Sequence, residues 1–258
     1  MANNTFYKYT IDEYASEAER LNKTDVPIKS KVNISGDSAS EEFSKSKDLA
    51  DALQIMRNGY KDAADKMNIT AAGVSQRRAN KLSVVGVPVV PLLLQNRPLC
   101  MMRRQNVQVK NNLVTIYINI SYAACIEANE IVKYSESVLN FAEGARAKNQ
   151  VKIYAVFASK DTRVTQKSTN TNIDIIEIYD SQKANSAALI SFALCHPSML
   201  RRLGFAHLRK LEAWESSNGY QAELSREQEL RYFGAGSYYI KAHELKQYRP
   251  DYSDAIVK

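Results

Sequence analysis

The most regular hydrophobic pattern of the chain lies in its middle third. Residues Leu113–Ser121 form a nearly continuous apolar run, which is typical of a strand buried on both faces of a sheet. Glu127–Lys148 follows with apolar residues at helical spacing, and Val151–Ala158 is a second apolar run. A strand, a helix and a strand with short connections predict a right-handed crossover between two adjacent parallel strands. We therefore expect an α/β fold with a mainly parallel sheet flanked by helices.

Further elements are predicted after this unit. Asn172–Tyr179 has the composition of a strand, and it can pair with Val151–Ala158 as a hairpin across the polar residues between them. Helices are expected at about Ala184–Cys195 and Pro197–Glu215. Proline suits the first turn of the second helix, where its missing N–H costs little.

The N-terminal part is more polar, and its pattern predicts helices. Thr10 and Glu13 have the spacing of a capping box, which predicts a short helix over Ile11–Leu21. A second helix is expected over Lys47–Asn58, with Gly59 as its end.

A change of pattern at residue 83 divides the chain. Residues 60–82 are interpreted as a further helical stretch, whereas from Ser83 the sequence is β-branched and interrupted by proline, which is confined to sheet edges and strand starts. The sequence thus predicts a polar, mainly helical N-terminal arm over residues 1–82 and an α/β core over residues 83–218. Residues 219–258 mix charge with aromatic side chains, and we expect a C-terminal tail that packs on the core or extends from it.

The composition is that of a folded protein. Of the 258 residues, 45 % are hydrophobic and 24 % are charged, which is enough apolar material for a large core. No apolar run approaches the roughly 20 residues of a membrane span, and the N-terminus lacks the layout of a signal peptide. The three cysteines are far apart and imply no disulfide framework. We therefore expect a protein of a reducing cytoplasm that binds no membrane.

The sequence contains no recognisable catalytic motif. None of the nine glycines has the spacing of a phosphate-binding or dinucleotide-binding loop, and no nucleophile elbow is present. His196 follows Cys195, but a single adjacent pair is no metal-ligand set. His207 falls on the apolar face of its predicted helix, so we expect a packed core residue. These observations predict a protein that is not an enzyme, with no cofactor and no metal ion.

The net charge of +7 arises in one segment. From Lys61 to Lys110 there are nine basic residues and two acidic ones, Asp62 and Asp65, so this segment accounts for the whole excess. A basic cluster attracts polyanions because phosphate contacts release condensed counterions; a chance cluster on a solvated surface is the alternative. The residues expected to contact phosphates are Arg77, Arg78, Lys81, Arg103 and Arg104. A second candidate patch comprises Arg201, Arg202, Arg209 and Lys210.

The end of the first central strand reads Asn119-Ile120-Ser121-Tyr122-Ala123. It resembles the metal-adhesion motif Asp-x-Ser-x-Ser of von Willebrand factor A domains, and the order of the following elements also resembles that fold. Asn119 replaces the aspartate and Ala123 the second serine, so a carboxylate and a hydroxyl that a hard cation needs are missing. The resemblance implies a von Willebrand A-like or Rossmann-like core without the ion.

Residues Val84 to Glu215 resemble a family of uncharacterised proteins found mainly in bacteriophages. The matching stretches are Pro98–Arg104, Ile116–Ser121 and Cys195–Ala206. Size and basicity are also similar to those of the single-stranded-DNA-binding transcription activators of podophages that encode a heterodimeric RNA polymerase. The resemblance implies a phage origin, a location in the host cytoplasm, and a phage RNA polymerase or another phage protein as partner.

Charge and resemblance together predict a phage nucleic-acid-binding accessory protein that binds single-stranded DNA in transcription or replication. The alternative is a metal-free von Willebrand A-like adaptor that binds a protein partner through the strand-end surface of its sheet. Salt dependence distinguishes the two, because phosphate binding weakens steeply with salt whereas an apolar adaptor interface does not.

Overall fold

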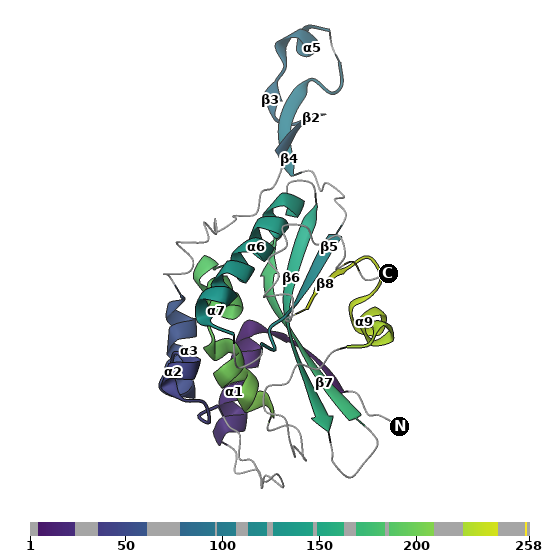
Figure 1. Ribbon diagram of the computed structural model, residues 1–258. Helices are drawn as coiled ribbons and strands as arrows, with labels where there is room; N and C mark the ends of the chain where they lie inside the picture. Colours follow the sequence, from purple (N-terminus) through teal and green to yellow (C-terminus); the bar gives the residue numbers. More distant parts are fainter. Residues whose placement is uncertain are drawn as a thin grey trace.

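The computed structural model describes residues 5–23, 36–60, 78–95, 97–106, 113–122, 126–146, 149–162, 169–183, 186–208, 224–241 and 256. Five strands form the main sheet: β1 (Thr5–Thr10), β5 (Leu113–Asn119), β6 (Gln150–Thr162), β7 (Thr169–Asp180) and β8 (Tyr238–Ile240). They lie side by side in the order β1-β7-β6-β5-β8. Figure 1 shows helices on both sides of this sheet.

The predicted crossover unit is confirmed. β5 and β6 are parallel neighbours, with Ile116 opposite Ile153, and the helix α6 (Ala128–Arg146) connects them. β6 and β7 form the predicted antiparallel hairpin. β8 pairs in parallel with β5, and β1 pairs in parallel with β7. The expected α/β class with a mainly parallel sheet flanked by helices is therefore confirmed, and the arrangement is consistent with a von Willebrand A-like or Rossmann-like core.

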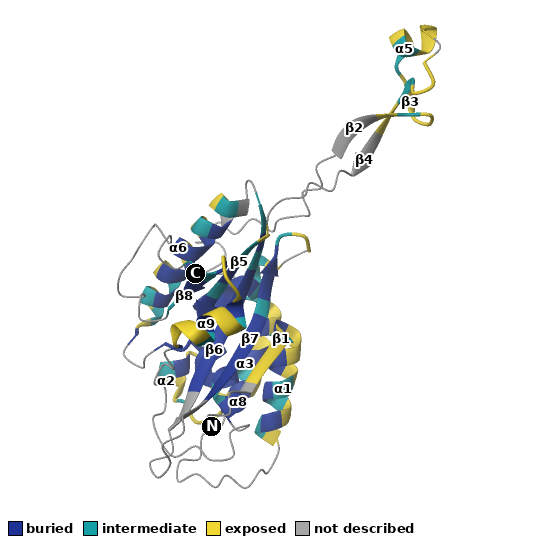
Figure 2. Cartoon of the chain, turned by 90° about the vertical axis from the view of Figure 1, so that its right-hand side faces the viewer, coloured by how far each residue is buried: buried dark blue, intermediate teal, exposed yellow. Residues whose placement is uncertain are grey.

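The two faces of the sheet are covered unequally (Figure 1). Alternate side chains of a strand point to opposite faces, so Ile153 faces a thick helical layer while Tyr154 faces the other side, where Phe233 lies. Among the described residues, the helix on that second face is α9 (Arg226–Phe233), which Figure 2 shows in front of the buried strands. Besides α6, the helical layer comprises α1 (Ile11–Lys23), α2 (Glu41–Ser44), α3 (Leu49–Asn58), α7 (Ala187–Cys195), the π-helical segment η1 (Met199–Gly204) and α8 (Phe205–His207).

The N-terminal helices form as predicted, but they are not an arm. Glu13 accepts a hydrogen bond from the Thr10 backbone N–H at 2.7 Å, which completes the capping box of α1, and Gly59 ends α3 with a positive φ of 79°. Both helices contribute buried residues to the main core, and β1 pairs with β7. The boundary expected after residue 82 is therefore wrong, because the N-terminal segment completes both the sheet and the helical layer.

A second, smaller sheet replaces part of the helical stretch expected over residues 60–82. Residues 78–83 form the strand β2 (Arg78–Ser83), which pairs with β4 (Met101–Asn106), and β4 pairs in turn with the short β3 (Val87–Pro88). The helix α5 (Val90–Leu94) lies between β3 and β4 in the chain. Residues 61–77 lie outside the described part. We call residues 78–106 the projecting ribbon, because Figures 1 and 2 both show it extending away from the main body.

Among the described residues, no helix combines the length and the apolarity needed to cross a membrane.

Candidate nucleic-acid interface

The projecting ribbon carries basic positions on both of its faces. Residues directly opposite each other in an antiparallel pair share a face, and successive residues alternate between faces. The register pairs Lys81 with Arg103, which places these two positions on one face. Arg78 and Arg104 belong to rows of the opposite face. Four of the five residues predicted for the first basic site are thus brought together on one structural element; the fifth, Arg77, lies outside the described residues.

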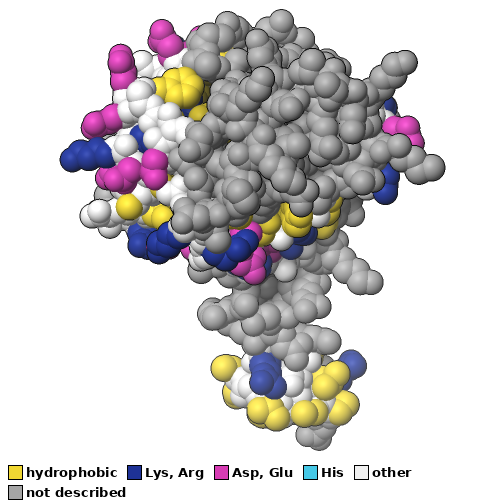
Figure 3. Space-filling view, turned by 90° about the horizontal axis from the view of Figure 1, so that it is seen from below, with side chains coloured by type: hydrophobic (Ala, Val, Ile, Leu, Met, Phe, Trp, Pro, Cys, Tyr) yellow, Lys and Arg dark blue, Asp and Glu magenta, His cyan; other side chains and the backbone are white. Residues whose placement is uncertain are grey.

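The ribbon lies within a long stretch of chain that contains no acidic residue. No Asp or Glu occurs from residue 66 to residue 126, so this stretch offers no carboxylate to neutralise its cations. Arg103 is solvent-exposed, and Figure 3 shows basic side chains among hydrophobic ones on the ribbon. A charge of one sign raises the local concentration of oppositely charged ligands. The basic residues of the stretch are Lys66, Arg77, Arg78, Lys81, Arg97, Arg103, Arg104 and Lys110.

The ribbon also exposes most of the large hydrophobic side chains found on the described surface. Val87 is 70 % exposed and Leu94 is 79 % exposed. Sequence reasoning recognised this region as β-branched but did not predict that its side chains stay in solvent. The signal in the sequence that could have indicated this exposed surface was the combination of repeated prolines with a complete lack of acidic residues. The exposed members are Leu82, Val84, Val85, Val87, Val90, Leu93, Leu94, Leu99 and Met102.

The second predicted basic patch is wrong for Arg201 and Arg202, because both side chains are buried. The Arg202 guanidinium is fully inaccessible and donates to the backbone oxygens of Ser46 at 2.6 Å and Lys47 at 2.7 Å. Arg201 donates to the backbone oxygen of Phe43 at 2.6 Å, and its guanidinium lies 3.7 Å from the centre of the Phe43 ring. Arg209 and Lys210 lie outside the described residues.

These two arginines hold the chain between α1 and α3 against the π-helical segment. Burial lowers the pKa of both guanidinium groups, while the neighbouring carboxylates of Asp37, Asp48 and Asp51 act in the opposite direction on Arg202. Charged residues are mostly exposed, so two adjacent arginines in sequence suggested a surface patch. Here the backbone oxygens of another segment satisfy their donors, and neither side chain reaches solvent.

The strand end that resembles a metal-adhesion motif satisfies its polar groups internally. The Asn119 side chain accepts from the backbone N–H of Ser121 at 2.9 Å and donates to the Tyr239 hydroxyl at 3.1 Å. The Ser121 hydroxyl donates to the Ala158 oxygen at 3.2 Å and accepts from the Ala158 N–H at 3.0 Å. Ala123 lies outside the described residues. In the described part of the chain, no three His, Cys, Asp or Glu side chains are grouped as a metal site would require.

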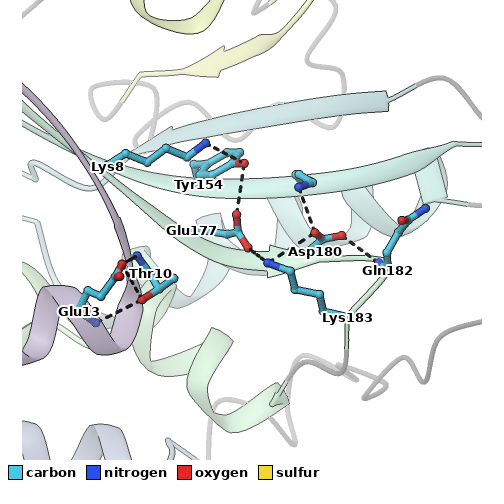
Figure 4. Close-up of polar contacts among 9 residues, drawn as sticks. Lys8, Thr10, Glu13, Tyr154, Glu177, Asp180, Gln182 and Lys183 are labelled. Atoms are coloured by element: carbon cyan, nitrogen blue, oxygen red, sulfur yellow. Dashed lines mark hydrogen bonds and ion pairs between the residues drawn. The ribbon is translucent and has the colours of Figure 1, made fainter.

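A polar network on β1, β6 and β7 is the other prominent cluster (Figure 4). Lys8 donates to the Tyr154 hydroxyl at 3.5 Å, and that hydroxyl donates to Glu177 at 3.4 Å. Lys183 forms ion pairs with Glu177 and Asp180. Burial, together with the Glu177 charge, raises the pKa of Tyr154 to about 12. The hydroxyl is therefore protonated at neutral pH, and Lys183 is balanced by two carboxylates, so this network does not resemble an anion-binding surface.

The interior histidines and cysteine are held within the core. His207 is the predicted core histidine: its ring is fully buried, stacks on Tyr14 at 3.7 Å, and lies 3.4 Å from the Asp174 carboxylate. Burial raises the pKa of the Cys195 thiol to about 12 and lowers the pKa of His196 to about 4. At neutral pH these two groups are an uncharged thiol and an uncharged imidazole, and neither is presented to solvent.

Comparison with known proteins identifies a family and no activity. A family model described as a domain of unknown function (DUF7192) matches residues 3–254. No curated protein matches the chain, and no solved structure matches it.

Proposed function

The chain belongs to the DUF7192 family, which is defined by a domain of unknown function, and we propose its function from its own surface. It is a nucleic-acid-binding accessory protein, and the projecting ribbon is its binding element. One observation carries this proposal. The ribbon presents basic positions on both faces, within a stretch from residue 66 to residue 126 that has no acidic residue.

The geometry of the ribbon suits an extended polyanion. Successive rows on one face of a strand lie about 7 Å apart, since each residue advances about 3.3 Å. The basic positions from Arg78 to Lys81 on β2, and those at Arg103 and Arg104 on β4, therefore follow the length of the ribbon. A phosphate backbone can lie along these rows and release a counterion at each contact. Single-stranded DNA is the form that we propose, and the partnership with a phage RNA polymerase stays a prediction.

The described residues at the strand end offer the adaptor alternative little polar surface. The side chains of Asn119 and Ser121 are buried and satisfied by Tyr239 and by the backbone. Neither of these two side chains is available to a protein partner, whereas the ribbon is exposed. This contrast favours nucleic-acid binding.

Fluorescence anisotropy with labelled single- and double-stranded oligonucleotides tests the proposal. Four phosphate contacts to a single strand should give a slope of about −2.8 for log affinity against log salt, or about 50-fold weaker binding at 200 mM than at 50 mM salt. Absence of binding at low salt, or affinity that hardly changes with salt, would contradict the proposed function.

A further inference from the structure

The end of the projecting ribbon is apolar, and its register explains why these residues lie together. Leu82 pairs with Met102 on one side of β4, and Val87 pairs with Met102 on the other, so the three form one row across three strands. They are 44 %, 38 % and 70 % exposed, respectively. Figure 3 shows hydrophobic side chains gathered at this end. We call this row, together with the exposed residues of α5, the apolar tip; contiguous exposed apolar surface of this kind usually marks a binding site.

The same face continues from the apolar tip into basic positions. In the direction away from the tip, the row of Leu82 is followed by the row of Arg104 and then by the row of Arg78. The occupant must therefore offer apolar surface and negative charge in sequence along one line. A second copy of this chain does not, because two ribbons would bring together like charges. The exposed large hydrophobic residues described outside the ribbon lie on three elements: Phe6 and Tyr7 on β1, Leu113 on β5 and Leu230 on α9.

A planar anionic bilayer matches this charge distribution less well. Arg78 lies four residues from Leu82 along β2, which is about 13 Å at about 3.3 Å per residue. Salt screens charges over about 8 Å at physiological ionic strength. A surface that touched only the apolar tip would meet Arg97, whose backbone N–H donates to Leu92 of α5, but it would gain little from the Arg78 row. A nucleic-acid strand that lies along the ribbon can use both rows.

We propose that the apolar tip contacts the faces of unpaired bases while the basic rows hold phosphates of the same strand. This inference rests on the proposed function and makes it more specific. Base faces are covered in a duplex and available in a single strand, where proteins stack them on aromatic rings or guanidinium planes. Proteins that hold an unstacked base also pack it between aromatic or apolar side chains. The ribbon contains no Phe, Tyr, Trp or His between residues 78 and 106, so the contact is aliphatic packing instead of ring stacking.

The test uses two strands that differ only in their bases. Affinities are measured for a single-stranded oligonucleotide and for the same strand with abasic sites, which keeps the phosphates. The protein is compared with the variant Leu82→Ser/Val87→Ser and with Leu230→Ser, which alters a similarly exposed leucine on α9. We expect the unmodified protein and the Leu230→Ser control to bind the intact strand about tenfold more tightly than the abasic strand. The double variant should lose this preference and keep the same salt slope.

Each outcome decides the inference. If the double variant prefers the intact strand as strongly as the unmodified protein does, the apolar tip does not contact bases. If the unmodified protein sediments with phosphatidylserine vesicles and the double variant does not, the apolar tip binds a bilayer, and the inference is also overturned. Failure of the unmodified protein to bind any strand would instead remove the proposed function. Circular dichroism checks folding, and the single variant Val87→Ser serves if the double variant is unstable.

Discussion

Replacing Arg202 by alanine should destabilise the protein severely, because its charged side chain is structural. The guanidinium is fully buried and donates to the backbone oxygens of Gly36, Ser46 and Lys47 and to the Ser46 hydroxyl. The alanine variant removes one donor from each of these acceptors and leaves a cavity in place of a large side chain. The Ser46 oxygen keeps its bond from the Ser44 hydroxyl, and the Ser46 hydroxyl keeps its bond with Ser198. Each buried acceptor left unsatisfied costs about 1–3 kcal/mol. The Gly36 and Lys47 oxygens lose the Arg202 donor. Together with the cavity, this loss should lower the free energy of unfolding by about 3–5 kcal/mol.

Urea denaturation followed by circular dichroism measures this loss. Arg103→Ala is the matched control, because Arg103 is exposed on the projecting ribbon and its removal should change stability by no more than about 0.5 kcal/mol. Arg202→Lys should fall between the two, since an ammonium group cannot reproduce the planar fork of donors. An Arg202→Ala variant that lost less than about 1 kcal/mol and instead lost DNA affinity would refute this structural role.

Three further predictions concern the core. Burial lowers the pKa of His196 from 6.5 to about 4. As the pH falls, the unfolded chain therefore binds a proton at this residue before the folded chain does. The free energy of unfolding should be constant above about pH 6.5 and fall toward pH 4, by about 2 kcal/mol at pH 5. His196→Asn should flatten this dependence, which urea titrations above pH 6.5 and at pH 5 measure. A Cβ at Gly59, where φ is 79°, would lie 2.1 Å from the Cβ of Ala188, so Gly59→Ala should lower the free energy of unfolding by about 2 kcal/mol or more. A Cβ at Gly144 on α6 would meet nothing within 4 Å, so Gly144→Ala should raise it by about 0.5 kcal/mol in the same assay. Magnesium should not raise the melting temperature through Ser121, and a stabilisation that disappears in Ser121→Ala would contradict the assignment of this hydroxyl to the backbone of β6.

The parts of the fold that were predictable are those whose pattern is local. The apolar run Leu113–Ser121, the amphipathic helix after it and the capping box at Thr10 each contain their own signal within a few residues. β1 contains none, because six mixed polar and aromatic residues become a strand only through pairing with β7, where Thr5 lies opposite Asn172. No periodicity in the sequence reveals a partner so distant in the chain.

The candidate interface was predictable in charge but not in shape. The excess of basic residues identified Arg103 and Arg104 from the sequence alone, and their pairing with β2 places them on a ribbon. The same reasoning failed for Arg201 and Arg202, since charge does not show whether backbone oxygens from elsewhere satisfy a guanidinium. It also missed the apolar tip, because hydrophobic runs are normally interpreted as core.

The salt dependence of single-stranded DNA binding in a ribbon variant tests the central claim most directly. Each lost phosphate contact should flatten the slope of log affinity against log salt by about 0.7, so Arg103→Ala/Arg104→Ala should flatten it by about 1.4. Arg57→Ala removes an exposed arginine from α3, 3.9 Å from Glu19, and should leave the slope unchanged. We predict this difference between the two variants. A folded double variant with the slope and affinity of the unmodified protein would show that nucleic acid does not bind through the projecting ribbon.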